Sequence, residues 1–353
     1  MSEQLNQLRD QIDAIDNEIL KLVNKRAEHA LEIGRRKGTG VVYRPEREAQ
    51  ILARLQELNP GPLPNERVTQ LFTEVMSTCR AMEKPMNVAY LGPRGTFSEE
   101  AALKRFGHVI STMACDSIDT VFRQVEASNA SYGVVPVENS SEGAIGRTMD
   151  LLLQTSLTVC GEIHLPVHQF LMAQDTDLSH IKRIYSHPQS LAQCHEWLNT
   201  NLPKPDRIHA SSNAEAARLA SADKDAAAIA GKQAAEVSQL TICAENIEDD
   251  PKNTTRFLVI GDQSVNASGK DKTSLAISTN NRPGAVHELL TFLAQQNVSM
   301  SRFESRPSRA GLWEYVFYVD IEGHQDDENV SAALAQVRDK AAFLKILGSY
   351  PAA

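Results

Sequence analysis

The chain has 353 residues, too many for one ordinary hydrophobic core, so two or three domains are expected. Its composition, 42% hydrophobic and 23% charged, is globular, and a net charge of −9 at pH 7 argues against nucleic acid or an anionic membrane as the main partner. No apolar run approaches the ~20 residues of a membrane span, and the N-terminus lacks the pattern of a signal peptide. The 5 cysteines are scattered without a CxxC pair, which predicts reduced thiols and a cytoplasmic location.

The first part of the chain predicts three helices. Residues 3–37 contain no proline and carry a coiled-coil-like seam of apolar residues at alternating spacings of three and four: Leu5, Leu8, Ile12, Ile15, Ile19 and Leu22. A helix of about 50 Å can bury such a stripe only against a partner, so we expect an intertwined dimer. Further helices are predicted over 45–58 and 65–83, separated by the turn-forming run 59–62.

Cationic side chains interrupt the apolar stripe of the first helix. Arg26 falls where the seam predicts a hydrophobic residue, and Lys37 lies about three turns further on, on nearly the same face. Arg9 lies ~25 Å from Arg26 on another face, so it could join the same small ligand only from a partner chain. The pattern is consistent with a pocket for a small polyanion, or with long cationic side chains that reach out of a coiled-coil seam.

Three motifs stand out in segment 3–84: Leu8-Arg9…Ile12…Asp16, Arg26…Ile33-Gly34…Lys37, and Tyr43-Arg44-Pro45-Glu46-Arg47-Glu48. Together they resemble the all-helical chorismate mutase family. The resemblance implies a site lined by Arg26, Lys37, Arg47, Glu48 and Glu83, together with the partner's Arg9. The chain departs from the family pattern at three positions: Arg44 is acidic in some members, Cys79 replaces a serine, and Glu83 replaces a glutamine.

The chemistry of a mutase site fits these residue types. The rearrangement of chorismate to prephenate is pericyclic and needs no nucleophile, so the protein has to hold two carboxylates in a reactive conformer and stabilise charge on the ether oxygen. Arginines clamp carboxylates with two hydrogen bonds, and Lys37 can donate to the ether oxygen. Glu83 can donate as well, but only when it is protonated.

From residue 87 the pattern changes to strands that end in polar residues and lead into helices. A strand over 87–91 precedes a glycine-rich turn over 92–98, and a strand-like run over 132–137 ends in Glu138. This layout recurs three times in a second lobe, after which 240–244 is predicted to return the chain to the first lobe. Open α/β sheets bind ligands at the carboxyl ends of strands, and two lobes enclose a cleft, so we expect the site between the lobes.

Several signals in this region allow a second interpretation. The run 96–99 is also a helix-capping box, and His187 is a candidate acid or base that could equally cap a helix or lie in a core. His164 and His168 have metal-like spacing, but Pro166 between them disrupts a helix, so no metal site is expected. No GxGxxG run follows a strand, which disfavours a nicotinamide enzyme.

Four motifs occur in order over 87–261: Gly92-Pro-Arg-Gly-Thr-Phe-Ser98, Val135-Pro-Val-Glu-Asn-Ser140, Ser186-His-Pro-Gln-Ser190 and Thr254-Thr-Arg-Phe257. They are similar to prephenate dehydratases, which implies a two-lobed fold like that of periplasmic binding proteins. By this resemblance Thr255 is the key catalytic residue, Arg256 binds a carboxylate, and Phe257 supports the site. The residues implied to position the substrate are Thr96, Ser98, Glu138, Asn139, Ser140, Gln189 and Ser212.

Prephenate must lose its ring hydroxyl and its ring carboxylate together to become phenylpyruvate. The enzyme must hydrogen-bond the departing hydroxyl while it leaves the carboxylate poorly solvated. A threonine hydroxyl is a poor acid, so we expect Thr255 to donate a hydrogen bond to the leaving group, with Glu138 or water as the source of the proton.

After a polar linker over 264–270, the last part of the chain predicts a βαββαβ order, which is ferredoxin-like. Gly284-Ala285-Val286-His287 and Glu304-Ser305-Arg306-Pro307 resemble the phenylalanine-binding segments of the regulatory ACT domain. The alternative is a purely structural α+β module with a tight glycine turn.

The sequence therefore predicts an all-α domain over 1–85, a two-lobed α/β domain over 86–263 with its second lobe at about 164–238, and an α+β domain over 272–353. The resemblances imply a bifunctional enzyme of phenylalanine biosynthesis that acts on chorismate and prephenate, is inhibited by L-phenylalanine, uses no cofactor or metal, and forms a homodimer or a higher oligomer. The alternatives are an arogenate dehydratase and a non-catalytic amino-acid sensor. Retention of Thr255, Arg26, Lys37 and Glu48 argues against the sensor.

Overall fold

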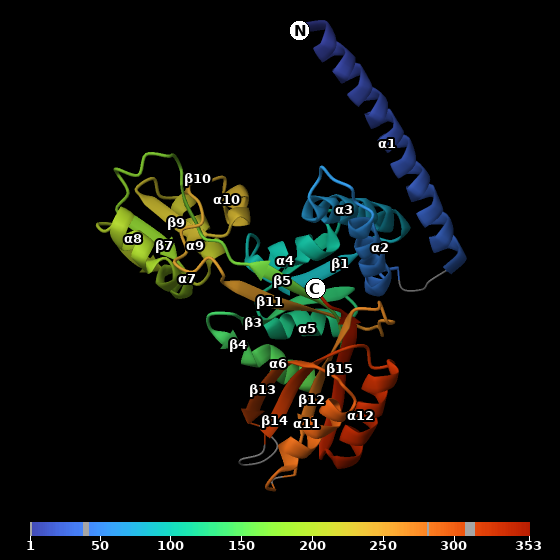
Figure 1. The fold of residues 1–353 in the computed structure, drawn as a ribbon. Coiled ribbons are helices and arrows are strands. Elements are labelled where there is room, and N and C mark those ends of the chain that lie inside the picture. Colours follow the sequence, from blue (N-terminus) through green and yellow to red (C-terminus); the bar gives the residue numbers. More distant parts are fainter. Residues whose placement is uncertain (1, 38–41, 281, 308–314) are drawn as a thin grey trace.

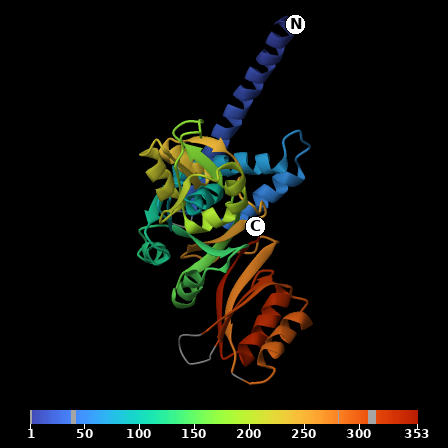
Figure 2. The same ribbon diagram turned by 90° about the vertical axis from the view of Figure 1, so that its left-hand side faces the viewer.

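The computed structural model describes residues 2–37, 42–280, 282–307 and 315–353, which form three successive units (Figure 1). A helical unit is followed by a two-lobed α/β unit and then by an α+β unit, in the predicted order. In both ribbon views the first lobe of the α/β unit lies at the centre and touches the helical unit, the second lobe and the α+β unit (Figures 1 and 2). None of the described helices is long and apolar enough to cross a membrane.

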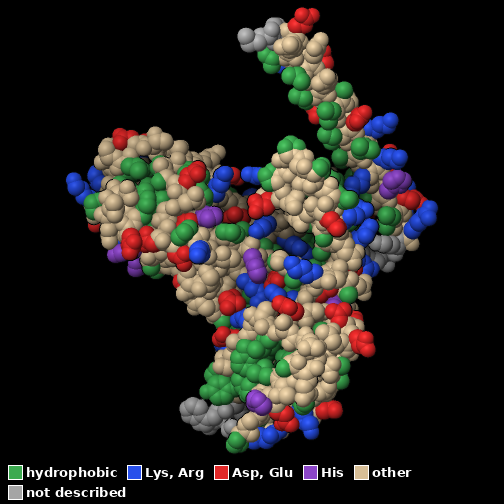
Figure 3. All heavy atoms as spheres, in the orientation of Figure 1, with side chains coloured by type: hydrophobic (Ala, Val, Ile, Leu, Met, Phe, Trp, Pro, Cys, Tyr) green, Lys and Arg blue, Asp and Glu red, His purple; other side chains and the backbone are tan. Residues whose placement is uncertain are grey.

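The helical unit consists of α1 (Ser2–Lys37), α2 (Pro45–Glu57) and α3 (Asn65–Glu83). Helix α1 packs on α3 through its C-terminal half, while its N-terminal half projects away from the rest of the chain (Figure 1). The predicted apolar seam is uncovered: Leu8 and Ile12 are each 56% exposed and Ile15 is 55% exposed. Hydrophobic side chains are visible along this helix in Figure 3. A stripe of this kind is stable in water only when another surface covers it.

The helical unit is joined to the first lobe by an aromatic cluster. The buried ring of Tyr43 packs against Phe106 and Tyr132, with ring centroids 4.9 and 5.1 Å away. The Arg80 guanidinium lies over the same ring and donates to the Phe106 carbonyl at 2.8 Å, and Arg105 Nε donates to the Tyr43 hydroxyl at 2.8 Å. Burial raises the pKa of Tyr43 to about 12, so this hydroxyl stays neutral at physiological pH.

The first lobe is built on a six-stranded sheet in the order β2-β1-β3-β11-β5, with the short β4 paired to β3. Strand β11 runs antiparallel to both of its neighbours and lies near the middle of the sheet. The strands are β1 (Asn87–Leu91), β2 (Ser111–Cys115), β3 (Tyr132–Asn139), β4 (Gly143–Ala144), β5 (Thr158–Pro166) and β11 (Thr254–Gly261). The helices of this lobe are α4 (Phe97–Phe106), α5 (Ile118–Glu126) and α6 (Gly146–Gln154).

The second lobe has a five-stranded sheet in the order β10-β6-β9-β7-β8. Its strands are β6 (Phe170–Ala173), β7 (Arg183–Ser186), β8 (Asp206–His209), β9 (Ala226–Ala230) and β10 (Thr241–Ala244). Its helices are α7 (Pro188–Gln193), α8 (His195–Asn201), α9 (Asn213–Ser221) and α10 (Lys232–Ser238). The three predicted strand-to-helix repeats are β7–α7, β8–α9 and β9–α10.

The structure corrects the predicted limits of the second lobe. Residues 240–244 do not return the chain to the first lobe, because β10 pairs with β6 as an edge strand of the second-lobe sheet. At the other end, His164 lies on β5 of the first lobe, opposite Arg256 of β11. The second-lobe sheet therefore spans 170–244.

Two crossing segments connect the lobes and run side by side. The backbone N–H of Val167 donates to the Asn253 carbonyl at 2.8 Å, and that of Ile247 donates to the Gln169 carbonyl at 2.9 Å. The buried Glu248 carboxylate fastens them further, since it accepts from the Gln169 N–H at 2.8 Å. The hinge between the lobes is thus a paired, hydrogen-bonded element.

The α+β unit has the predicted βαββαβ order and a four-stranded antiparallel sheet, β13-β14-β12-β15. Helices α11 and α12 pack on one face of the sheet (Figure 2). The other face packs on the first lobe, where Val316, Tyr318 and Leu347 join the core around α5 and α6. The elements are β12 (Asp271–Ser278), α11 (Ala285–Gln295), β13 (Met300–Pro307), β14 (Tyr315–Glu322), α12 (Glu328–Lys340) and β15 (Phe343–Pro351).

Candidate active site

A cleft of about 930 Å³ lies between the two lobes of the α/β unit. The helices α4, α7, α9 and α10 all begin at its wall, and α4 and α7 begin within two of the predicted motifs. Their first turns carry backbone N–H groups without helical acceptors, together with a positive helix-dipole end. The cleft is therefore suited to an anionic ligand.

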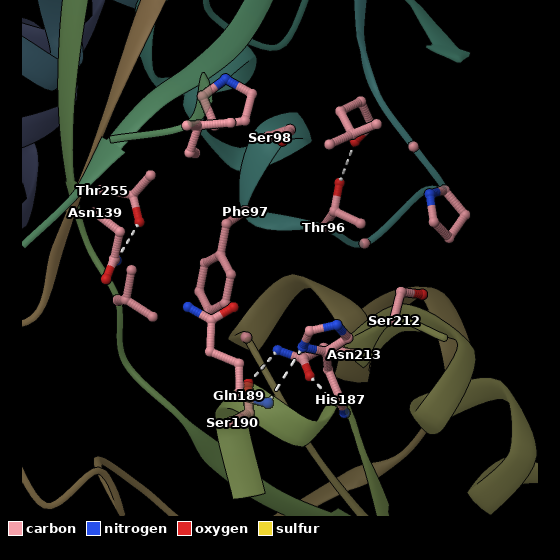
Figure 4. A pocket seen from close by; sticks show the side chains of 18 of the residues that line it. Thr96, Phe97, Ser98, Asn139, His187, Gln189, Ser190, Ser212, Asn213 and Thr255 are labelled. Carbon is pink, nitrogen blue, oxygen red and sulfur yellow. Dashed lines mark hydrogen bonds between the residues drawn. The ribbon is translucent and has the colours of Figure 1, made fainter. Parts of the chain in front are cut away.

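Thr255 lies on the first-lobe side of the cleft, opposite Asn139 in the β3–β11 pair. Asn139 Nδ2 donates to Thr255 Oγ1 at 2.9 Å (Figure 4). It also donates to Asn253 Oδ1 at 2.9 Å. Asn139 Oδ1 accepts from the N–H groups of Ser141 and Glu142, so every polar atom of this amide is engaged. Because the Thr255 oxygen already accepts a hydrogen bond, its own O–H is available to donate to a ligand.

The glycine-rich turn after β1 forms the second part of the first-lobe wall. Thr96, Phe97 and Ser98 all line the cleft. The predicted capping box does not form in its usual way, since Thr96 Oγ1 donates to the Leu91 carbonyl at 3.0 Å and the Glu99 carboxylate accepts from the N–H of Gly95 at 2.6 Å. These bonds fold the turn against the strand and leave Ser98 at the start of α4.

The second-lobe wall consists mainly of uncharged polar side chains. Gln189 and Ser212 line the cleft as predicted, and Ser212 also caps α9 by accepting from the Glu215 N–H at 3.0 Å. His187 caps α7 in the same way, since its Nδ1 accepts from the Gln189 N–H at 3.3 Å, so the capping alternative describes it. It also lies at the cleft.

Three residues that line this wall and hydrogen-bond to one another were not predicted from the sequence: Gln169, Ser190 and Asn213. Ser190 Oγ accepts from Asn213 Nδ2 at 2.8 Å and from Gln169 Nε2 at 3.0 Å. Ser190 belongs to a predicted motif and Asn213 directly follows the predicted Ser212. Their closeness in sequence to predicted site residues could have identified them as part of the cleft. Gln169 lies on the hinge, where no motif pointed to it.

Few cationic side chains reach the cleft. Among the described residues that line it, Arg94 is the only lysine or arginine, and its side chain is 72% exposed. A dianion bound deep in the cleft would be met by hydroxyls, amides and the N-terminal ends of α4 and α9 rather than by a buried guanidinium.

Two predicted site residues point away from the cleft. Arg256 Nε donates to Glu162 at 2.8 Å, and its Nη1 donates to Asp320 of the α+β unit at 2.5 Å. Glu138 pairs with Arg302 of the same unit at 2.8 Å. Successive side chains of a strand point to opposite faces, so when Thr255 and Asn139 face the cleft, Arg256 and Glu138 face the α+β unit. The predictions that Arg256 binds a substrate carboxylate and that Glu138 supplies a proton are therefore wrong for this arrangement.

Two further predicted residues support the site from its edge. Phe257 is 2% exposed and borders the cleft from within the core. Ser140 accepts from the Thr254 N–H at 3.0 Å and so fastens the end of β3 to β11. It does not line the cleft.

The residues predicted for a mutase site are not gathered around one pocket in the single chain. Glu48 of α2 forms an ion pair with the buried Arg80 of α3, and Glu83 lies against Gly34 of α1. Arg26 is half-buried on α1, whereas Arg47 and Arg9 are exposed, with Arg9 on the projecting half of that helix. The side chain of Lys37 lies outside the part of the chain that the structure describes.

The two predicted regulatory segments lie at the start of α11 and at the end of β13. Val286 lines a small apolar cavity between α11 and the sheet, together with Phe303, which directly precedes the second segment. Gly284 begins α11 with a φ of 80°, Ala285 is buried and His287 is exposed. Of the second segment, Ser305 and Pro307 are exposed and Glu304 is half-buried, while Arg306 turns toward α6, where it lies 3.5 Å from Asp150.

The two histidines with metal-like spacing, His164 and His168, each pair with a different glutamate. His168 Nδ1 lies 2.7 Å from the buried Glu248, and the exposed His164 lies 3.7 Å from Glu162. Across the described residues, no group of three or more His, Cys, Asp or Glu side chains is placed to hold a metal ion.

Fold and cleft thus define a two-lobed ligand-binding domain fused to a helical unit and an α+β unit. Family models match each unit: chorismate mutase type II over residues 8–84, prephenate dehydratase over 88–265 and the ACT domain over 273–339. The chain is 54% identical to a bifunctional chorismate mutase/prephenate dehydratase of Neisseria gonorrhoeae, over 100% of this chain and 99% of that relative. It belongs to the bifunctional chorismate mutase/prephenate dehydratases and is an enzyme with both domains.

Two solved structures resemble the α/β and ACT units. A prephenate dehydratase from Arthrobacter aurescens in complex with L-Phe is 34% identical with a TM-score of 0.70, covering 75% of this chain and 89% of that chain. A protein described as a novel type of quorum quenching acylase is 28% identical, also with a TM-score of 0.70, covering 76% and 98%. One architecture therefore carries more than one described activity, and the residues of the cleft must decide the reaction.

Proposed function

We propose that the cleft converts prephenate to phenylpyruvate and that the helical unit supplies prephenate from chorismate. The observation that carries the first assignment is the Thr255 hydroxyl, which accepts from Asn139 and is free to donate into the cleft. A leaving hydroxyl needs such a donor, held in place by a group that does not compete for the proton.

The proposed dehydratase step needs only positioning and one hydrogen bond. The ring C–O bond breaks as hydroxide leaves, and the C–C bond to the ring carboxylate breaks to release carbon dioxide. The electron pair of that C–C bond completes the aromatic ring, and the hydroxide gains a proton to become water. Thr255 stabilises the departing oxygen; with Glu138 on the far face of the sheet, solvent water is the proton source that fits.

The mutase step is proposed for a dimer of the helical unit. The exposed seam of α1 needs a partner surface, and a second copy of the same helix offers a matching stripe. A partner chain laid along α1 would bring the partner's Arg9 toward Arg26, Glu48 and Glu83. The apolar stripe and the incomplete set of clamping residues both support this arrangement.

Feedback inhibition by L-phenylalanine is proposed for the ACT unit. The support is the family match of this unit and the solved relative that holds L-Phe. Adding L-phenylalanine to the full chain is expected to lower prephenate turnover. Unchanged turnover at saturating L-phenylalanine would remove this part of the proposal.

The decisive experiment is a coupled assay on the purified full chain, with chorismate, prephenate or arogenate supplied separately. Wild type is expected to form phenylpyruvate from chorismate and from prephenate. Thr255→Ala should lose at least a hundredfold in prephenate turnover, the loss expected when one key transition-state donor is removed, and should keep mutase activity.

Thr254→Ala is the matched control, because Thr254 precedes Thr255 on the same strand, does not line the cleft, and uses its hydroxyl to donate to the Lys252 carbonyl. It should keep both activities. Preference for arogenate over prephenate would redirect the assignment, and formation of neither product would favour a sensor.

A further inference from the structure

We propose that Asp320 of the ACT unit is a positioning residue for the dehydratase reaction: it holds Arg256, and through Arg256 it fixes the strand that presents Thr255 to the cleft. The inference rests on the proposed dehydratase function. It assigns a role in turnover to a residue that lies outside the α/β unit.

The register of the β3–β11 pair places the two faces of the sheet one residue apart. Thr255 is paired with Asn139, and the next pair is Arg256 with Glu138. The first pair faces the cleft and carries the hydrogen bond on which Thr255 depends. The second pair faces the ACT unit, so any force on these two side chains acts one residue away from the catalytic hydroxyl.

The ACT unit contacts both Arg256 and Glu138. Arg256 reaches Asp320 Oδ2 at 2.5 Å and the Tyr350 hydroxyl at 3.0 Å, and Glu138 reaches Arg302 at 2.8 Å. The Arg256 side chain is only 11% exposed. The Arg256–Asp320 contact is therefore buried and little screened by solvent, whereas the Glu138 side chain is 37% exposed.

Burial and a second hydrogen bond hold the Asp320 side chain in place. It is 4% exposed, and its other oxygen accepts from Ser274 Oγ at 2.5 Å. Ser274 also shares a hydrogen bond of 2.6 Å with the Tyr350 hydroxyl. The two ACT groups that contact Arg256 are thus linked to each other, which gives the guanidinium one defined position.

The ACT unit does not need this polar network to stay packed on the first lobe. Apolar side chains already bury the boundary between the ACT unit and the first lobe, among them Val316, Tyr318 and Leu347. A buried ion pair adds little stability compared with an apolar contact, and its best-attested use is to specify one arrangement. Strand β11 also has an irregularity in its pairing between Arg256 and Phe257, and such irregularities re-aim side chains beside active sites.

The test is Asp320→Asn in the full chain, with kcat and KM measured for prephenate. The carboxamide keeps the size of the side chain and removes one of the two carboxylates that pair with Arg256, while the other, Glu162 on β5, stays in place. We expect kcat to fall on the order of tenfold or more, because small displacements of a catalytic group are costly, while KM stays within about twofold. Tyr350→Phe, which removes only one hydrogen bond to Arg256, should show a smaller fall in kcat.

Lys345→Met is the matched control. Lys345 Nζ donates to the carbonyls of Leu152 and Leu153 at the end of α6, so it crosses the same boundary without touching β3 or β11. This variant should loosen the boundary and keep the wild-type kcat. Mutase activity reports folding of the helical unit in each preparation, and a wild-type thermal unfolding transition reports folding of the rest of the chain.

Three outcomes would overturn the proposal: an unchanged kcat in folded Asp320→Asn, a rise in KM alone, or an equal loss of kcat in Lys345→Met. Failure of the proposed function itself looks different, because wild type would then not turn over prephenate at all.

Discussion

At the scale of single residues, Glu162 links β11 to the ACT unit on the face of the sheet away from the cleft. This carboxylate is 3% exposed and accepts from Arg256 and from Lys272 Nζ, the latter at 2.7 and 2.9 Å. Burial acts to raise the pKa of Glu162, but the hydrogen bond to His164 and the charges of Arg256 and Lys272 outweigh it and hold the pKa well below the ordinary value of 4.5. The side chain is therefore ionised wherever the enzyme is folded near neutral pH.

The sign of this shift gives a pH prediction for Glu162→Gln. A depressed pKa stabilises the fold fully above the unfolded-state value of 4.5, and this contribution is lost as pH falls toward the lower folded-state value. At pH 7 the variant should be about 3 kcal/mol less stable, because it leaves Arg256 and Lys272 without their shared partner. Below about pH 4.5 the gap should narrow.

Denaturant unfolding at several pH values would measure this gap. His168→Gln is a suitable comparison, because it alters another glutamate partner, Glu248, on the hinge and away from Glu162. A gap that widens toward acid would refute the assigned sign.

At the scale of elements, the turn after β1 meets the start of α10 across the cleft. Gly231, which precedes α10, lies against the Phe97 ring: a Cβ added there would stand 2.9 Å from Phe97 Cε1. Figure 4 shows Phe97 projecting toward the second-lobe residues around Gln189. A side chain at residue 231 would force the Phe97 ring or the lobe itself to shift.

Gly231→Ala is therefore expected to hold the lobes slightly apart. KM for prephenate should rise on the order of tenfold, since a cleft that closes less often binds its ligand more weakly, and mutase kinetics should not change. In a double-mutant cycle, Gly231→Ala should raise KM less in the Phe97→Leu background than in the wild type, because the smaller side chain leaves room for the added Cβ. Additive effects of the two substitutions would show that this contact does not limit closure.

The elements also show which features a sequence can specify. Helix α3 was predicted at its observed bounds and α2 to within one residue, because prolines and a polar turn mark their ends locally. The sequence does not show which face of the sheet Arg256 occupies. The first residues of β11 face the cleft on one side and the ACT unit on the other, so they lack the usual alternation of polar and apolar residues. The place of β10 was likewise set by pairing with the distant β6.

The candidate site divides in the same way. Thr96, Ser98, Asn139, Gln189, Ser212 and Thr255 were predicted from motifs and do line the cleft. Glu138 was predicted to contact the substrate, but like Arg256 it faces the ACT unit. Gln169 escaped notice because its role comes from the hinge, which brings together segments far apart in the chain.

At the scale of the whole molecule, the exposed seam of α1 predicts that the two activities respond differently to one substitution. Ile15→Glu places a charge in the seam, where Ile15 is now 55% exposed. Mutase activity should fall roughly a hundredfold, the loss expected when an essential clamp from a partner chain is withdrawn. Prephenate turnover should stay within about twofold, because none of the described residues that line the cleft belongs to α1.

Asn17→Glu introduces the same side chain on the opposite face of α1 and should leave mutase activity intact. Light scattering would report the association state of each variant. Wild-type mutase activity in a preparation of Ile15→Glu would count against a shared helical site.

The projecting helix has a consequence for how the enzyme behaves at different abundances. If a mutase site takes groups from two chains while each cleft belongs to one, dilution removes the first activity before the second. A sparsely expressed enzyme would then have dehydratase capacity in excess of its mutase capacity. Prephenate would be consumed as fast as it formed, and overall flux to phenylpyruvate would rise more steeply than the number of copies.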